Sequence, residues 1–85
     1  MASYRVLIKR SAAKELTDLD VKNRRRIVDR IRALADEPRP PGAEKLSGRD
    51  HYRVRQGVFR ILYEIADRGL TVTIVKIGHR RDIYR

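Results

Sequence analysis

The chain has 85 residues, of which 21 are Lys or Arg and 11 are Asp or Glu, so its formal net charge is +10. This length predicts one domain, residues 1–85, with a core too small for high stability in isolation. Such an excess of positive charge favours polyanionic partners: nucleic acid, an anionic membrane surface or an acidic protein. Cysteine is absent, which excludes disulfides and thiolate metal sites. We expect a cytoplasmic protein, because no segment reads as a signal peptide or a membrane span.

The first half of the chain predicts one strand and two helices. Side chains alternate over residues 4–9, as is typical of a strand. Ser11 is a suitable N-cap for a short helix that extends through Leu19. A second helix is expected after Asp20 or Asn23. Its apolar face consists of Ile27, Val28, Ile31, Leu34 and Ala35.

The second half predicts three strands joined by tight turns. Pro38 ends the second helix and begins a stiff connector. Strands are expected over Tyr52–Arg55, Phe59–Ile65 and Leu70–Ile77, with Gln56-Gly57 as the first turn. The last of these runs is apolar on both faces. The order β-α-α-β-β-β predicts an α+β domain, in which two N-terminal helices pack on a mostly antiparallel four-stranded sheet.

Arginine is concentrated on and after the predicted strands. Arg53 and Arg55 are two positions apart and therefore project from the same face of a strand. Arg60 lies on the strand expected to pair with theirs, and Arg80 and Arg81 follow the last strand. Guanidinium groups bind phosphate oxygens bidentately through charge-assisted hydrogen bonds. Together these residues predict a phosphate site, whereas each one taken singly is typical of a solvated strand face.

The segment Gly78–Arg85 combines guanidiniums with an imidazole and a phenol. His79 lies among arginines, where neighbouring positive charge favours the neutral imidazole that serves as a base. The alternative is an exposed histidine beside a turn. Tyr84 is suited to stacking on a nucleobase, and Arg85 adds a cation. His51 precedes a predicted strand and is interpreted as a residue without a catalytic role.

Neither a metal nor another cofactor is expected. Divalent-metal nucleases need clustered carboxylates. Most acidic residues, Glu44 among them, fall on the predicted helices or the connector, away from the arginine-rich strands, and only Asp82 lies near the candidate site. The polar face of the second helix is interpreted as a solvated surface that steers the chain toward RNA or an RNA–protein surface. It carries Lys22, Arg24, Arg25, Arg26, Arg30 and Arg32.

Three segments resemble the RelE/ParE superfamily of toxin–antitoxin toxins, with the RelE branch as the closer match. They are Lys45–Gly48, Tyr52–Ile65 and Val75–Tyr84, and the two-helix N-terminal half also fits, so the resemblance covers nearly the whole chain. It implies a ribosome-dependent mRNA endonuclease that acts in the decoding site. In this family the ribose 2′-hydroxyl attacks the adjacent phosphate without a metal, leaving a 2′,3′-cyclic phosphate and a 5′-hydroxyl.

The resemblance also implies roles for individual residues. Arg53, Arg55, Arg60, Arg80 and Tyr84 match functional positions of the family. Arg53 and Arg60 are expected to hold and neutralise the pentacoordinate phosphate. Arg80 is expected to donate toward the leaving 5′-oxygen, and Tyr84 to stack on the nucleotide.

One departure from the family concerns the general base. Some relatives have lysine at the positions of Arg53 and Arg55, whereas guanidinium is effectively never deprotonated. Either His79 takes the proton, or the rate comes mostly from positioning and charge. Arg81 and Arg85 are expected to bind RNA phosphates.

The partner implied by the resemblance is a RelB-like antitoxin, acidic and partly disordered until it binds. A toxin–antitoxin hetero-oligomer is expected, with operator DNA bound through the antitoxin. Two alternatives are a ParE-like, non-catalytic inhibitor of DNA gyrase and a basic nucleic-acid-binding module. The ParE branch generally lacks the arginine–tyrosine constellation at the C-terminus, which favours the nuclease.

Overall fold

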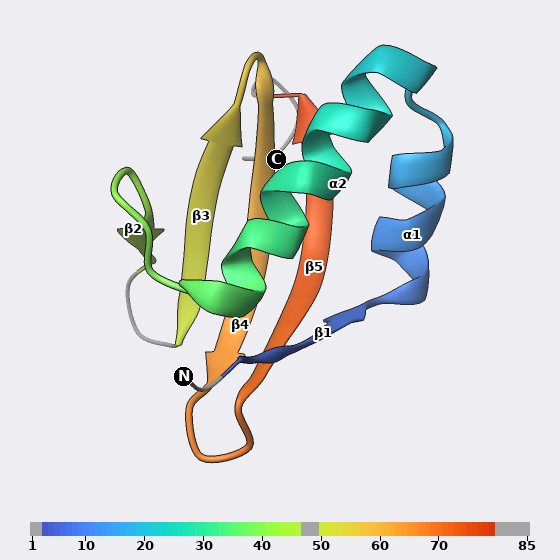
Figure 1. Ribbon diagram of the computed structural model, residues 1–85. Helices are drawn as coiled ribbons and strands as arrows, with labels where there is room; N and C mark the ends of the chain where they lie inside the picture. The colour runs from blue at the N-terminus through green and yellow to red at the C-terminus, as the bar shows by residue number, and fades with distance from the viewer. Residues whose placement is uncertain (1–2, 47–49, 80–85) are drawn as a thin grey trace.

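The computed structural model describes residues 3–46 and 50–79. These residues form the strand β1 (Arg5–Ile8), the helices α1 (Arg10–Thr17) and α2 (Val21–Asp36), and the strands β2 (Glu44–Lys45), β3 (His51–Gln56), β4 (Phe59–Ala66) and β5 (Thr71–His79) (Figure 1). The predicted α+β class is confirmed. The sheet has five strands where four were predicted, because the two-residue strand β2 is too short to show a periodic pattern in the sequence.

The strand order in the sheet is β1-β5-β4-β3-β2. β1 runs parallel to β5, and every other neighbouring pair is antiparallel. A turn at Gly57 and Val58 joins β3 to β4, and Gly57 has a φ of 62°, a conformation that favours glycine. The predicted turn therefore lies one residue later than the Gln56-Gly57 dipeptide suggests.

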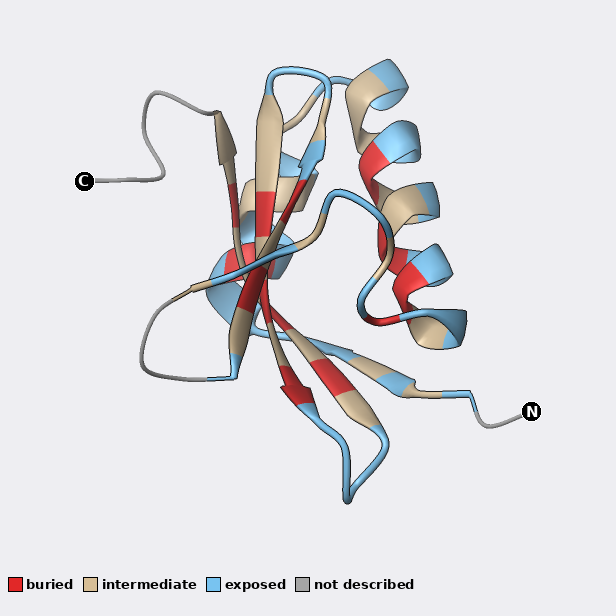
Figure 2. Ribbon diagram, turned by 90° about the vertical axis from the view of Figure 1, so that its left-hand side faces the viewer, coloured by how far each residue is buried: buried red, intermediate tan, exposed pale blue. Residues whose placement is uncertain are grey.

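The core lies between the helices and one face of the sheet (Figure 2). The apolar face predicted for α2 is the buried one, with Ile27 and Leu34 fully buried. Burial of such a side chain contributes about 1.5–3 kcal/mol. The sheet supplies Tyr52, Val54, Ile61, Tyr63, Ile65, Val72, Ile74 and Ile77 to this core. We call the opposite face of the sheet the open face, because no helix or strand of the described residues covers it (Figure 2).

The two helices begin differently. The Asp20 carboxylate accepts hydrogen bonds from the Asn23 backbone (3.3 Å) and side chain (2.7 Å), which lower its pKa and confirm Asp20 as the N-cap of α2. The prediction of Ser11 as N-cap is wrong. α1 begins at Arg10, and Lys9 occupies the cap position without a side-chain hydrogen bond. The backbone of Lys9 still bonds to Ile74 on β5, so helix and strand follow one another directly.

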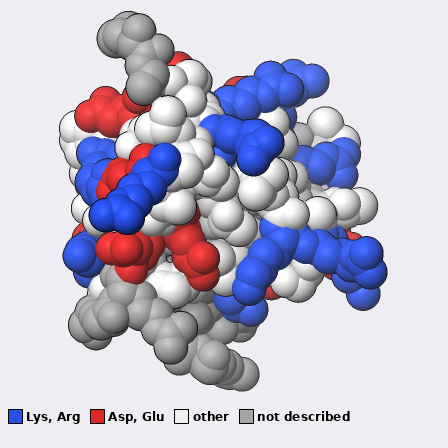
Figure 3. Space-filling model, turned by 90° about the horizontal axis from the view of Figure 1, so that it is seen from below, with Lys and Arg blue, Asp and Glu red and all other residues white. Residues whose placement is uncertain are grey.

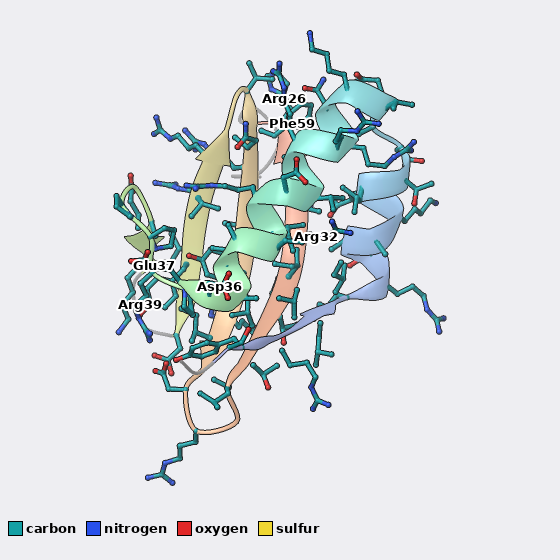
Figure 4. All side chains as sticks on the ribbon, in the orientation of Figure 1. Arg26, Arg32, Asp36, Glu37, Arg39 and Phe59 are labelled. Atoms are coloured by element: carbon teal, nitrogen blue, oxygen red, sulfur yellow. The ribbon has the colours of Figure 1, made fainter. Side chains whose placement is uncertain are left out.

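The connector between α2 and β2 is tied to the turn between β4 and β5. Arg39 (labelled in Figure 4) lies over the Tyr52 ring, with 5.1 Å from its guanidinium carbon to the ring centroid. Its two terminal nitrogens donate to the Asp67 carboxylate at 3.1 and 2.9 Å, and the Tyr4 hydroxyl donates to the same group at 2.8 Å. The bonds from Arg39 and Tyr4 hold the pKa of Asp67 below its ordinary value.

An irregularity in β5 decides which of its residues face the helices. Leu62 lies opposite Lys76, but Tyr63 lies opposite Ile74, so Val75 is an extra residue in β5. A β-bulge of this kind breaks the alternation of a strand. Even-numbered residues point toward the helices before the bulge, and odd-numbered residues do so after it.

Candidate functional site

Side chains of the open face form three rows that cross β3, β4 and β5. From the end at the Gly57 turn, the rows are Arg55–Arg60–Gly78, Arg53–Leu62–Lys76 and His51–Glu64–Thr73. Successive rows are two residues apart along each of β3 and β4, which is roughly 6.6 Å. The open face thus presents cations at one end and an imidazole–carboxylate pair at the other.

The first row brings Arg55 and Arg60 directly opposite one another on paired strands. Like charges in this position repel, and an anion bound between them removes the repulsion. Gly78, the next residue in the row, has no side chain. A Cβ added there would meet none of the described atoms within 4 Å, so the backbone beside Arg60 is open to a ligand.

The second row holds Arg53 together with an acidic partner that was not predicted. The Arg53 side chain is 11% exposed, and its Nη2 forms an ion pair with Glu44 of β2. The expectation that Glu44 lies away from the arginine-rich strands is wrong, because β2 pairs with β3 and places Glu44 opposite Arg53. The Glu44 carboxylate binds the guanidinium in the way that a phosphate group would.

His79 projects from the other face of the sheet. It lies opposite Phe59, and the two rings are in edge contact with centroids 6.0 Å apart. Phe59 packs against the core, so His79 stands on the side of the helices. The structure therefore does not bring His79 together with Arg55 and Arg60. The predicted site residues Arg80, Arg81, Tyr84 and Arg85, and also Asp82, lie outside the described residues.

His51 is the histidine that shares a face with the arginines. Its Nε2 lies 2.7 Å from Glu64 Oε1, and both residues line a groove of about 350 Å³. The sequence contains the signal for this placement, because His51, Arg53 and Arg55 alternate on one strand. The prediction missed this placement because it started the strand at Tyr52, whereas β3 begins at His51.

The remaining charge is unevenly distributed. Arg26 and Arg32 on α2 are exposed (Figure 4), whereas Arg24 donates to the backbone oxygens of Thr17 and Leu19 and ties α2 to α1. Viewed from the end at which the β4–β5 turn lies, Asp and Glu side chains gather mainly on the β2–β3 side of the molecule (Figure 3). On the opposite side of this view Lys and Arg predominate, which favours long-range attraction of a polyanion there (Figure 3).

Residues 3–46 and 50–79 contain neither a cluster of metal-ligating side chains nor a helix that could span a membrane. No group of three or more His, Asp or Glu in these ranges is placed to hold a metal ion. In the same ranges, neither helix has the length and apolar character needed to cross a membrane.

The fold and the open face together define a small α+β domain with helices on one side of a sheet and paired arginines on the other. A family model described as the ParE toxin of type II toxin–antitoxin systems, parDE, matches residues 6–84. The chain therefore belongs to the RelE/ParE family of toxins of type II toxin–antitoxin systems.

Individual relatives agree with this assignment. A putative RelE-like toxin protein of Escherichia coli is 28% identical over 85 residues, which cover 95% of this chain and 90% of the relative. The structure of the toxin–antitoxin complex RelBE2 from Mycobacterium tuberculosis matches with a TM-score of 0.83 at 28% identity, covering 96% of this chain and 97% of the other. The archaeal RelE–RelB complex from Pyrococcus horikoshii matches with a TM-score of 0.81, also at 28% identity, covering 94% and 98%.

Proposed function

We propose that this toxin is a ribosome-dependent endoribonuclease, which cuts mRNA in the decoding site and stops translation in the cytoplasm. The observation that carries the proposal is the row Arg55–Arg60–Gly78, where two guanidiniums on paired strands adjoin open backbone. Preorganised positive charge stabilises the pentacoordinate phosphate of the transition state more than the ground-state diester. Similarity to RelE-like toxins, at 28% identity to the Escherichia coli relative and to the toxin of the Mycobacterium tuberculosis complex, supports the RelE branch and its reaction on RNA.

In the proposed reaction, the ribose 2′-oxygen attacks the neighbouring phosphorus while the bond from phosphorus to the 5′-oxygen breaks. The products are a 2′,3′-cyclic phosphate and a 5′-hydroxyl, and the proton lost at the 2′-oxygen is balanced by one gained at the 5′-oxygen. The resemblance implies that Arg53 and Arg60 hold the phosphate, but we assign this role to Arg55 and Arg60, because Arg55 lies opposite Arg60 whereas Arg53 is paired with Glu44. Arg80 donates a hydrogen bond toward the leaving oxygen. Tyr84 stacks on the nucleotide, and flanking phosphates are bound by Arg53, Arg81 and Arg85.

The proposal assigns most of the rate to positioning and charge. Guanidinium does not act as a base at neutral pH, and His79 faces the helices rather than Arg60. Correct positioning alone can lower the activation barrier by several kcal/mol. No metal is invoked, because the described residues contain no group of three or more His, Asp or Glu placed to hold one.

The test uses ribosomes programmed with a defined message, followed by mapping of the 5′ ends. We expect cuts in phase with codons, with 5′-hydroxyl termini. Arg60→Ala is expected to lower the cleavage rate by about 100-fold to 1,000-fold, in line with loss of one charge-stabilising donor. Arg80→Ala should act similarly, whereas Arg68→Ala, in the exposed β4–β5 turn, is the matched control. Unchanged cleavage by Arg60→Ala, or 5′-phosphate termini, would contradict the proposal.

A RelB-like antitoxin is the partner that we propose. The solved relatives from M. tuberculosis and P. horikoshii are toxin–antitoxin complexes. A net charge of +10 suits an acidic segment that orders when it binds, and the resulting hetero-oligomer is proposed to bind operator DNA through the antitoxin. Calorimetric titration with the product of the neighbouring gene tests this, and an absence of tight binding counts against it.

A second candidate function is inhibition of DNA gyrase, since the matching family model carries the ParE name. A supercoiling assay with purified gyrase separates the two. Loss of supercoiling without cuts in ribosome-bound mRNA would favour this candidate over the nuclease.

A further inference from the structure

The third row of the open face borders a groove whose lining has no role in the proposed cleavage. The groove measures about 350 Å³ and is lined by Asp50, His51, Glu64, Ile65, Ala66 and Thr73. His51, Glu64 and Thr73 come from three adjacent strands and project from the same face as Arg55 and Arg60. The volume of the groove falls within the range of about 300–1,000 Å³ that is typical of small-ligand sites.

The polar groups of the groove are mainly acceptors. Glu64 Oε1 lies 2.7 Å from His51 Nε2, and 43% of the Glu64 side chain is exposed. A carboxylate offers about four lone-pair sites, so the contact with His51 leaves capacity for further donors. The imidazole also presents a flat face of the kind on which unstacked bases of single-stranded RNA are held. The pair thus combines a stacking surface with an acceptor of fixed position.

The groove lies on the path that an RNA strand bound at the first row would follow. His51 is four residues from Arg55 along β3, which is about 13 Å at the usual rise of a strand. Arg53 lies between them, and a phosphate that replaces Glu44 would bind its guanidinium in the same way. An RNA strand that is anchored at Arg60 and runs along β3 and β4 therefore places a nearby nucleotide over Glu64.

We infer that this groove is a nucleobase subsite, which selects an amino-bearing base and disfavours uracil. An amino group donates to the Glu64 carboxylate, as the N4 amino group of cytosine does to acidic side chains in nucleic-acid readers. Uracil instead places a carbonyl oxygen at the corresponding position, and two acceptors then face one another with no proton between them, which is unfavourable. The inference rests on the proposed function, because the RNA reaches the groove from the phosphate held at the first row.

Binding of short RNA tests the subsite without any need for cleavage. Fluorescently labelled hexacytidylate and hexauridylate are compared by anisotropy at one salt concentration, because both are pyrimidine strands of equal charge. We expect the wild-type protein to bind the cytidine strand about tenfold more tightly, the size of discrimination typical of one good side-chain–base contact. Glu64→Gln, whose amide both donates and accepts, should bind the two strands equally. Glu37→Gln removes the same charge from the exposed end of α2 and should retain the preference.

Equal binding of the two strands by the wild-type protein overturns the inference, as does an absence of measurable binding to either. A preference that survives in Glu64→Gln overturns the role of Glu64. The wild-type ratio is informative even if the variant does not fold.

Cleavage on ribosomes then separates this inference from the proposed function. Messages that differ only by cytosine or uracil at one position near the cut should differ in cleavage rate with wild type and Glu37→Gln, but not with Glu64→Gln. Normal cutting with no difference between the messages overturns the subsite and leaves the proposed function intact. No cutting of any message removes the proposed function, and the oligonucleotide ratios then decide the subsite alone.

Discussion

Gly78 occupies the position where function and stability make opposite demands on one residue. Its backbone is ordinary strand, and a Cβ would meet no described atom within 4 Å. Gly78→Ala should therefore leave the free energy of unfolding unchanged or raise it by about 0.4–1 kcal/mol, since alanine restricts the unfolded chain. The methyl group would occupy space beside Arg60 that the proposed phosphate site uses, so the proposed function predicts slower cleavage. Urea unfolding and ribosome cleavage measure the two effects.

Gly69→Ala is the matched control for this substitution. Gly69 lies in the β4–β5 turn, where the added Cβ would make an ordinary 3.5 Å contact with the Thr71 hydroxyl. Its cleavage rate should equal that of the wild type. Full activity in Gly78→Ala would show that no substrate group approaches the backbone at the first row.

Simple alternation was enough to predict the arginine cluster at the residue scale. Arg53 and Arg55 share a face because a strand has a period of two, and the short turn brings Arg60 opposite Arg55. The face occupied by His79 was not predictable in this way. The run before His79 is apolar on both faces, so the sequence does not show which of its residues face the helices. The bulge at Val75 then reverses the alternation of side chains along β5.

At the scale of elements, α1 secures the end of β5 that leads into the first row. β1 pairs with β5 only as far as Ile74, and beyond that point Glu15 of α1 supplies a hydrogen-bond acceptor to β5. Its Oε1 accepts from the Ile77 backbone N–H at 3.0 Å, and its Oε2 lies 3.4 Å from Lys76 Nζ. Glu15→Ala leaves the Ile77 N–H without this acceptor and should lower the free energy of unfolding by about 1–2 kcal/mol. Glu15→Gln keeps a carbonyl oxygen and should cost less. Equal stability of the two variants in urea would contradict this role.

The ion pair between Arg39 of the connector and Asp67 of the β4–β5 turn gives a second prediction, on stability in acid. Because the pKa of Asp67 is lowered in the folded protein, its contribution is present above the unfolded value and is lost as the pH falls through the folded one. Asp67→Asn should therefore lower the thermal midpoint at pH 7, and the difference from wild type should shrink below about pH 4. A difference that is constant from pH 7 to pH 3 would show that the ion pair with Arg39 does not set this stability.

The elements themselves were predicted where the pattern was long. The buried face of α2 and the strands β3 and β4 follow from periodicity, whereas β2 has only two residues and owes its existence to pairing with β3. That pairing is also what brings Glu44 to Arg53. A contact between segments nine residues apart, made by an irregular connector, has no signature in local sequence.

For the molecule as a whole, a net charge of +10 acts on encounter more than on chemistry. Arg25 and Arg26 are exposed on α2, and replacing both by Glu would reduce the net charge from +10 to +6, since each substitution changes it by two. We expect slower association with ribosomes at low salt, by roughly tenfold, and an unchanged cleavage rate once the toxin is bound. Raising the ionic strength should shrink the difference, because exposed charges are screened beyond about 8 Å at 0.15 M. Stopped-flow association across a salt series measures this. If the bound complex of the variant also cuts more slowly, α2 contributes to the geometry of the site and not only to attraction.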